Sequence, residues 1–160
     1  MAVLAFCNFF PKPLGEYIEP RNQNRALMIG AADFLAQSPA PDSVIFTDQQ
    51  GYEFLNYYLC GSQRFDFEER YPELLEAHCP GCRLIVRHQF NFKADTFAQQ
   101  FHELQQKYNL DSGMKVWLFQ AGWYIDRDSS LRADFANAGC TTPHEYGRNI
   151  LVCPAVLGPP

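Results

Sequence analysis

Five polar or aromatic side chains that could bind a ligand follow the apolar runs that look most like buried strands. They are Asp48, Gln89, Gln120, Trp123 and Asp126. Carboxylate and amide groups hydrogen-bond the hydroxyls of a sugar, and an indole face packs against its C–H bonds. Because ligands of open α/β sheets bind beyond the carboxyl ends of the strands, the sequence predicts a ligand site here. Two structural roles remain open, namely a helix cap for Asp48 and a lid on the core for Trp123.

An enzymatic role would need groups that exchange protons. Asp48 and Asp126 are the candidates for general acid and base at the strand ends. Asp126 and Asp128 lie close together in sequence, which is also typical of a turn followed by a helix cap. The residues alone therefore do not separate catalysis from a structural role.

Four residues have the spacing of a redox or metal motif, Cys79-Pro80-Gly81-Cys82. In thioredoxin-like proteins such a motif lies where a strand enters a helix, but here we expect it to follow a helix and to precede a strand. A zinc site would need two further ligands, and no second CxxC or HxxxH pair is present. We expect a Pro-Gly turn with incidental thiols or a local disulfide, so cysteine usage leaves the compartment open.

The absence of known sequence motifs argues against several classes of enzyme. No GxGxxG, GxxxxGK[ST] or GxSxG sequence occurs, and His144-Glu145 lacks the second histidine of a zincin. We therefore expect no nucleotide cofactor and no metal. The net charge is −5 with no basic run, which argues against nucleic acid as a partner.

The elements that must position these residues alternate in type. Helical spacing of apolar residues predicts helices over 22–37, about 48–59, 67–75, 95–108 and 128–139, with Asp48 and Asp95 as caps. Short β-branched and aromatic runs predict strands over 43–46, 83–90, 115–121 and 149–152, with a polar loop over 140–148. The composition, 47% hydrophobic and 19% charged, is sufficient for a packed core.

This alternation predicts an α/β fold. We expect a small three-layer sandwich with a mainly parallel sheet of about four strands and helices on both faces. A single domain over 20–155 would be followed by a tail over 156–160. The apolar segment 1–13 has two readings: a buried strand or docked tail, or the stump of a membrane helix.

The run Pro41-Asp42-Ser43-Val44-Ile45-Phe46-Thr47-Asp48, followed by Tyr57-Tyr58-Leu59-Cys60, resembles a segment of multi-spanning glycosyltransferases. Val116 to Trp123 and the run Tyr146-Gly147-Arg148-Asn149-Ile150 are similar to the ends of bacterial members. The family is the polyprenyl-phosphate-sugar-dependent mannosyl- and aminoarabinose-transferase superfamily, and the resemblance covers about residues 20 to 153. In that family a soluble extracytoplasmic α/β domain follows a bundle of membrane helices.

The resemblance implies an accessory domain that helps to bind the acceptor or the lipid-linked donor. The catalytic acids of the family lie between membrane helices, so none is carried over to this chain. Its partners would be the membrane-embedded remainder of the same protein and a sugar or lipid-linked sugar. The implied location is the extracytoplasmic face of a membrane. The alternatives are a free-standing small α/β enzyme, cytoplasmic in that case, and a non-catalytic binding module.

Overall fold

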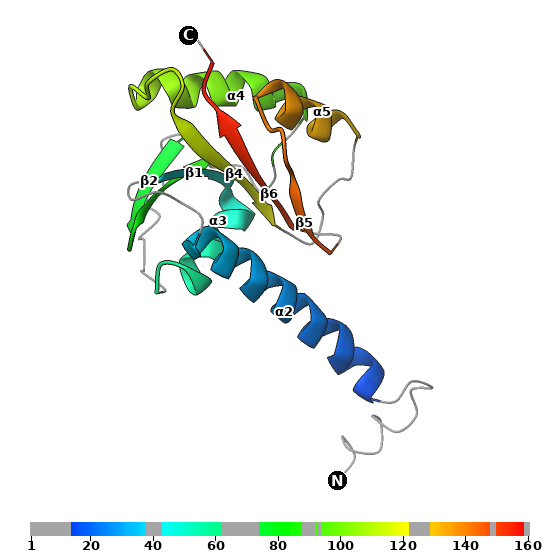
Figure 1. The fold of residues 1–160 in the computed structure, drawn as a ribbon. Coiled ribbons are helices and arrows are strands. Elements are labelled where there is room, and N and C mark those ends of the chain that lie inside the picture. Colours follow the sequence, from blue (N-terminus) through cyan, green and yellow to red (C-terminus); the bar gives the residue numbers. More distant parts are fainter. Residues whose placement is uncertain are drawn as a thin grey trace.

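A computed structural model describes residues 14–37, 43–61, 74–87, 92, 94–121, 129–147 and 150–158. Its elements alternate much as expected (Figure 1). The helices are α2 (Leu14–Gln37), α3 (Gln49–Tyr58), α4 (Ala94–Lys107) and α5 (Ser129–Asn137). The strands are β1 (Ser43–Asp48), β2 (Leu74–Cys79), β3 (Cys82–Arg87), β4 (Lys115–Ala121), β5 (His144–Tyr146) and β6 (Ile150–Val156).

The described strands form one mixed sheet in the order β2-β3-β1-β4-β6-β5. β1 runs parallel to β3 and to β4, so the three central strands share a direction. β2 is antiparallel to β3, and β6 is antiparallel to both β4 and β5. The α/β class is confirmed, but the mainly parallel sheet of about four strands is wrong. The expected fourth strand, β6, runs antiparallel to β4, and the two further strands, β2 and β5, add antiparallel pairs at the edges.

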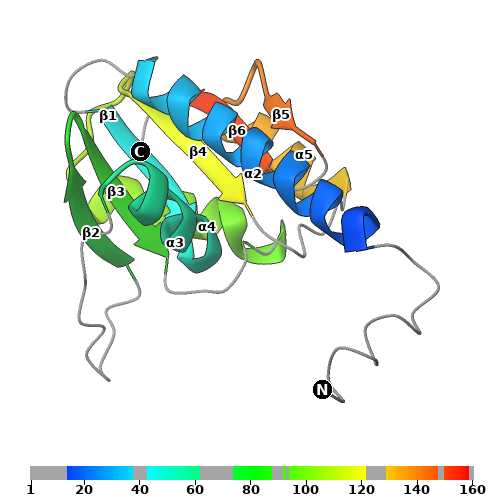
Figure 2. The same ribbon diagram turned by 90° about the horizontal axis from the view of Figure 1, so that it is seen from below.

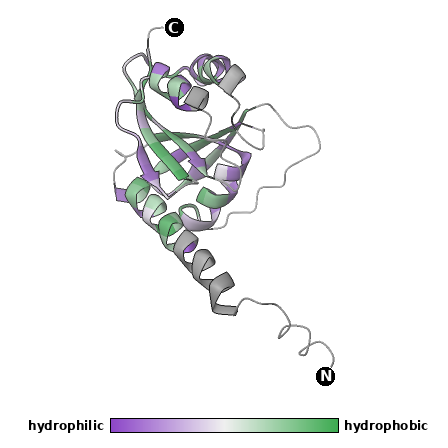
Figure 3. Ribbon diagram, turned by 90° about the vertical axis from the view of Figure 1, so that its right-hand side faces the viewer, coloured by the Kyte–Doolittle hydropathy of each residue, from purple (hydrophilic) through white to green (hydrophobic). Residues whose placement is uncertain are grey.

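Helices cover both faces of the sheet, which confirms three layers. α2 packs across β5 and β6, and α3 packs across β1, β3 and β4 (Figure 2). α4 and α5 contact each other on the opposite face. Figure 3 shows hydrophobic stretches along the strands between these layers. β1 is buried over its whole length, as expected for a central strand whose two faces are both covered.

Two hydrophobic clusters fill the spaces between the layers. Phe46, Ile85, Phe97, Leu118 and Phe135 belong to the cluster under α4 and α5. Alternate residues of the same strands belong to the second cluster, which lies under α2 and α3 and is called here the α2–α3 cluster. Its strand residues include Ile45, Leu84, Phe119 and Val152. This alternation follows from the two-residue period of a β-strand.

Three local expectations were wrong. Leu74 and Leu75 were expected in a helix but lie in β2, because an antiparallel partner strand outweighs an apolar spacing that fits both structures. Residues 144–146 were expected in a loop but pair with β6. Asp95 was expected to cap a helix but is the second residue of α4.

The structure describes part of the expected tail over 156–160 but none of the apolar segment 1–13. Residues 1–13, including the proposed stump of a membrane helix, lie outside the described residues. Near the other end, Val156 is the last residue of β6, and Leu157 is buried and exchanges backbone hydrogen bonds with Gly113 and Met114. No described helix is long and apolar enough to cross a membrane.

Candidate functional site

The carboxyl ends of the three parallel strands lie at one edge of the sheet. β1 ends at Asp48, β3 at Arg87 and β4 at Ala121, and the register pairs Asp48 with Arg87. On the other side, Thr47 pairs with Phe119, so the next position of the ladder places Asp48 beside Gln120. Arg87, Asp48 and Gln120 therefore form a polar row across three strands. We call this row the strand-end row.

The side chains of the row lie on the α4–α5 face of the sheet. Asp48 bonds Phe92, a member of the cluster on that face, and Arg87 reaches Glu103 of α4. Gln120 lies between Phe119 and Ala121, whose side chains belong to the opposite face. The structure thus brings together two of the five predicted site residues, Asp48 and Gln120.

The carboxylate of Asp48 is fully buried and its two oxygens have different partners. Oδ1 accepts a hydrogen bond from the backbone nitrogen of Gly51 at 2.7 Å, which makes Asp48 the N-cap of α3. Oδ2 accepts from the backbone nitrogen of Phe92 at 3.1 Å. The cap expected from sequence is confirmed, and a second, long-range bond is added to it.

Two opposing effects act on the pKa of Asp48. Burial in the core raises it, because the charged form loses its hydration. Hydrogen bonds from the backbone, led by that of Gly51, lower it, since they favour the carboxylate. Burial is the larger effect, and the pKa rises to about 7. A carboxyl group that titrates near neutrality has the acidity of a general acid or base.

The backbone of Gly51 packs closely against the side chains of Thr47 and Phe119. A Cβ atom at position 51 would meet Oγ1 of Thr47 at 2.1 Å and Cδ1 of Phe119 at 3.0 Å. Glycine is therefore required in the first turn of α3, so that its nitrogen can reach Asp48. Local sequence spacing gives no signal for this role, because the contact depends on β4 as well as β1.

Buried oxygen atoms near this edge lack hydrogen-bond donors. Oε1 of Gln120, Oγ1 of Thr47 and Oε1 of Gln50 have no partner. Gln120 is 1% exposed and Thr47 is fully buried. A buried acceptor without a donor costs about 1–3 kcal/mol, so such atoms are expected where a ligand or water supplies the donor. The hydroxyls of a sugar are donors of this kind.

The basic groups of β3 have acidic partners. Arg87 contacts Glu103 at 3.0 Å and its side chain is 16% exposed, while Arg83 contacts Glu76 at 3.3 Å. The ion pairs reduce the net positive charge of this part of the sheet. Arg87 nevertheless places a guanidinium group in the strand-end row, a feature found only from the register of the sheet.

The remaining predicted site residues, Gln89, Trp123 and Asp126, lie outside the described residues. Their sequence positions follow β3 and β4, whose carboxyl ends belong to the edge just described. Cys153 directly follows the strand predicted over 149–152, but it lies within β6. Because β6 runs antiparallel to β4, Cys153 pairs with Leu118 inside the sheet.

His144 and Glu145 have local structural contacts. The imidazole of His144 packs against the ring of Phe34, with centroids 4.4 Å apart, and Glu145 forms an ion pair with Arg132. Among the described residues no group of three or more His, Cys, Asp and Glu side chains could hold a metal ion.

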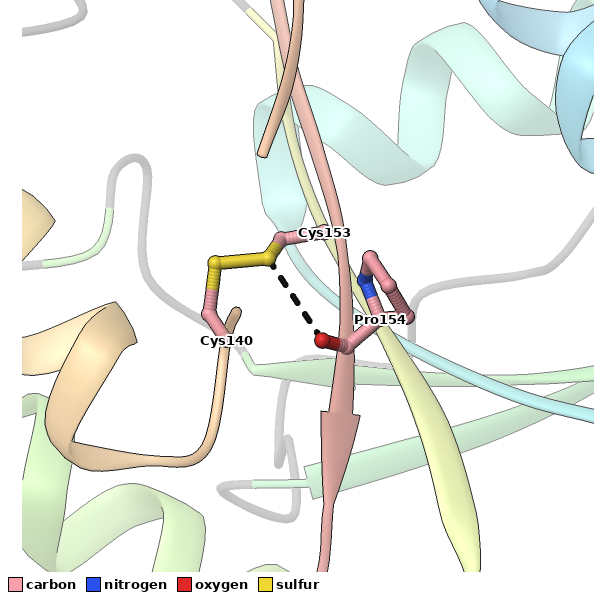
Figure 4. Close-up of a disulfide and its surroundings, with 3 residues drawn as sticks. All are labelled: Cys140, Cys153 and Pro154. Atoms are coloured by element: carbon pink, nitrogen blue, oxygen red, sulfur yellow. Dashed lines mark hydrogen bonds between the residues drawn. A yellow bond between two sulfur atoms is a disulfide. The ribbon is translucent and has the colours of Figure 1, made fainter. Parts of the chain in front are cut away.

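The cysteines form two disulfides, Cys60–Cys79 and Cys140–Cys153. Figure 4 shows the second, where Sγ of Cys153 lies 3.5 Å from the carbonyl oxygen of Pro154. Cys82 is a buried free thiol. The Pro-Gly turn expected at 80–81 is confirmed, whereas the local disulfide considered between Cys79 and Cys82 is not formed.

Comparisons with protein-family models, with curated proteins and with solved structures gave no match to this chain.

Proposed function

We propose that this chain is an extracytoplasmic accessory domain of a membrane-bound glycosyltransferase. It helps to bind the acceptor or the lipid-linked sugar donor and does not catalyse transfer itself. Its partner is then the membrane-embedded remainder of the same protein.

The observation that carries the proposal is the pair of disulfides, Cys60–Cys79 and Cys140–Cys153. Disulfides form and persist in oxidising compartments and are rare in the cytosol. They therefore support the extracytoplasmic part of the proposal, which the sequence resemblance implied on independent grounds.

The bonding of Asp48 supports a binding role over a catalytic one. Both carboxylate oxygens accept bonds from backbone N–H groups, so the side chain holds α3 and the segment at Phe92 in place. Gln120, by contrast, has an acceptor oxygen without a donor. We assign sugar recognition to the strand-end row, with Gln120 as the residue that receives a hydroxyl group.

The test is binding of the full chain to phosphatidylcholine vesicles, with and without a polyprenyl-phosphate-linked mannose or aminoarabinose. We expect co-flotation to increase when the sugar lipid is present, relative to vesicles that contain the polyprenyl phosphate alone. The Gln120→Leu variant should lose that increase and remain folded. Equal co-flotation with all vesicles would overturn the assignment of sugar recognition.

The coding sequence upstream of Met1 tests the partner. An open frame with several apolar segments of about 20 residues is expected, since each would span a bilayer. An in-frame stop codon and a ribosome site just before Met1 would exclude a membrane-embedded remainder of the same chain.

A free-standing α/β enzyme is the second candidate, and one observation favours it. The pKa of Asp48 rises to about 7, the range useful for proton transfer at neutral pH. This candidate requires that the isolated chain turns over a substrate and that Asp48→Asn abolishes the turnover. Thermal unfolding must show that the variant is still folded. Sugar-lipid binding without turnover would support the accessory domain instead.

A further inference from the structure

Three cysteines gather at the hairpin formed by β2 and β3. Cys60, which follows α3, is bonded to Cys79 at the end of β2. The antiparallel register places Cys82, the first residue of β3, directly opposite Cys79. Cys60 and Cys82 belong to the α2–α3 cluster and Cys79 packs against it, so all three lie on that side of the sheet. Cys79 thus has two cysteines within reach, one bonded and one free.

We infer that Cys60, Cys79 and Cys82 form an internal thiol–disulfide exchange centre, in which Cys79 is bonded either to Cys60 or to Cys82. Cys82 loses its proton, and its thiolate attacks Sγ of Cys79. The Cys79–Cys60 bond breaks, and Cys60 leaves as a thiolate that takes up a proton. One disulfide and one thiol are present before and after the step, so no oxidant or reductant is consumed.

The hairpin geometry brings the alternative pair close to bonding distance. Residues directly opposite in an antiparallel pair have Cβ atoms about 4.5–5.5 Å apart, and a disulfide needs about 3.8 Å. Cys79 and Cys82 flank the two-residue turn at 80–81, which is exposed, and Gly81 has a φ of +78° with open space around it. A small closure of this turn is therefore all that the second pairing requires.

The two pairings differ in what they hold together. The Cys60–Cys79 bond ties the end of α3 to β2, the edge strand of the sheet, and closes a loop with a sequence separation of 19. A Cys79–Cys82 bond would close the hairpin alone and would release the end of α3. Exchange would thus switch the covalent connection between the end of α3 and β2 on and off.

Burial keeps the resting pairing in place. Cys82 is 7% exposed, and burial raises the pKa of its thiol to about 11. The attacking thiolate is therefore scarce at neutral pH, and exchange should accelerate about tenfold per pH unit until that pKa is reached. Cys140–Cys153 provides an internal control, because the free thiol that the structure describes lies in the other cluster.

Tryptic peptides distinguish the pairings directly. Trypsin cleaves after Arg25, Arg64, Arg70 and Arg83, which places Cys60 in peptide 26–64 and both hairpin cysteines in peptide 71–83. The resting pairing yields these two peptides joined and carrying one alkylated thiol. The exchanged pairing yields peptide 71–83 with an internal disulfide and peptide 26–64 alkylated at Cys60.

The Cys7→Ser variant of the full chain is held at about pH 7 and at about pH 9. Exchange is then stopped with acid, free thiols are alkylated, and the disulfides are identified from the tryptic peptides. We expect the exchanged peptide to appear about a hundred times faster at the higher pH. Cys82→Ser should abolish it, and the Cys140–Cys153 peptides should not change. An exchanged peptide that forms at the same rate at both pH values, or that still forms in Cys82→Ser, would overturn the proposal.

A Cys60→Ser variant keeps the test decisive if exchange is too slow to follow. In a glutathione redox buffer its two hairpin cysteines should oxidise to each other, while the Cys140–Cys153 peptides and the circular dichroism spectrum remain those of the folded chain. If both thiols remain open to alkylation in the folded variant, the hairpin does not support the second pairing and the proposal fails.

Discussion

The carboxylate of Asp48 accepts a hydrogen bond at 3.1 Å from the backbone nitrogen of Phe92, 44 residues further along the chain. The same side chain caps α3 through Gly51. One buried carboxylate therefore holds two separate segments at the carboxyl end of β1, the edge to which we assign ligand binding.

The stability of the chain should depend on pH through Asp48. Because its folded pKa is about 7 and the ordinary value is 3.8, the folded state holds a proton that the unfolded state has lost. Its contribution to stability is thus present below about pH 4 and is lost as the pH rises to about 7, at up to roughly 1.4 kcal/mol per unit. Urea unfolding at several pH values measures this dependence.

Asp48→Asn removes the titrating group and is the comparison for that series. The difference in unfolding free energy, wild type minus variant, should fall between about pH 4 and pH 7 and then level. A difference that rises over the acidic range would show instead that the backbone hydrogen bonds outweigh burial and that the folded pKa is depressed.

Two glycine-to-alanine substitutions within helices should have opposite effects. Gly51→Ala places a Cβ 2.1 Å from Oγ1 of Thr47 and should destabilise the fold by about 1–3 kcal/mol. Gly30→Ala in α2 meets Tyr146 at an ordinary 3.6 Å and should stabilise the helix by about 0.5–1 kcal/mol. Thermal unfolding of both variants checks the signs, and a tolerated Gly51→Ala would contradict the close packing.

Two buried glutamines provide a matched pair. Gln120→Leu removes an oxygen that has no donor, so the stability of the free chain should be unchanged or higher. Gln105→Leu removes a hydrogen bond from Nε2 to the carbonyl oxygen of Gly158 at 2.8 Å and should cost about 1 kcal/mol. A comparable loss in both variants would mean that Gln120 is hydrogen-bonded in solution, and its role as an open acceptor would be withdrawn.

Removal of the Cys140–Cys153 disulfide should lower stability by about 3 kcal/mol, since it closes a loop with a sequence separation of 13. Chemical denaturation of the Cys140→Ala/Cys153→Ala double variant measures this loss. The same variant in the presence of a reductant is the control, because it should then be insensitive to reduction at this site. An unchanged midpoint would indicate that the bond does not constrain the unfolded chain.

Local patterns in the sequence were sufficient to locate the four helices and the three central strands that the structure describes, although they also predicted a helix at Leu74 and Leu75, which lie in β2. The spacing of Ala31 and Leu35, and of Phe97, Phe101 and Leu104, predicted the buried helix faces, because side-chain direction within a helix follows from sequence position. Likewise, the polar side chain of Asp48 after an apolar run predicted its role as a cap. These features depend on residues only a few positions apart.

Only the tertiary structure decided which strands pair and in which direction. The chain from Leu74 to Arg87 forms a hairpin at the edge of the sheet. β6 runs antiparallel to β4, because a strand from another part of the chain satisfies its backbone hydrogen bonds. That arrangement joins Cys60 to Cys79, aligns Arg87 with Asp48 and requires glycine at position 51. Each of these contacts joins residues from different elements, and the spacing of residues within one element does not predict them.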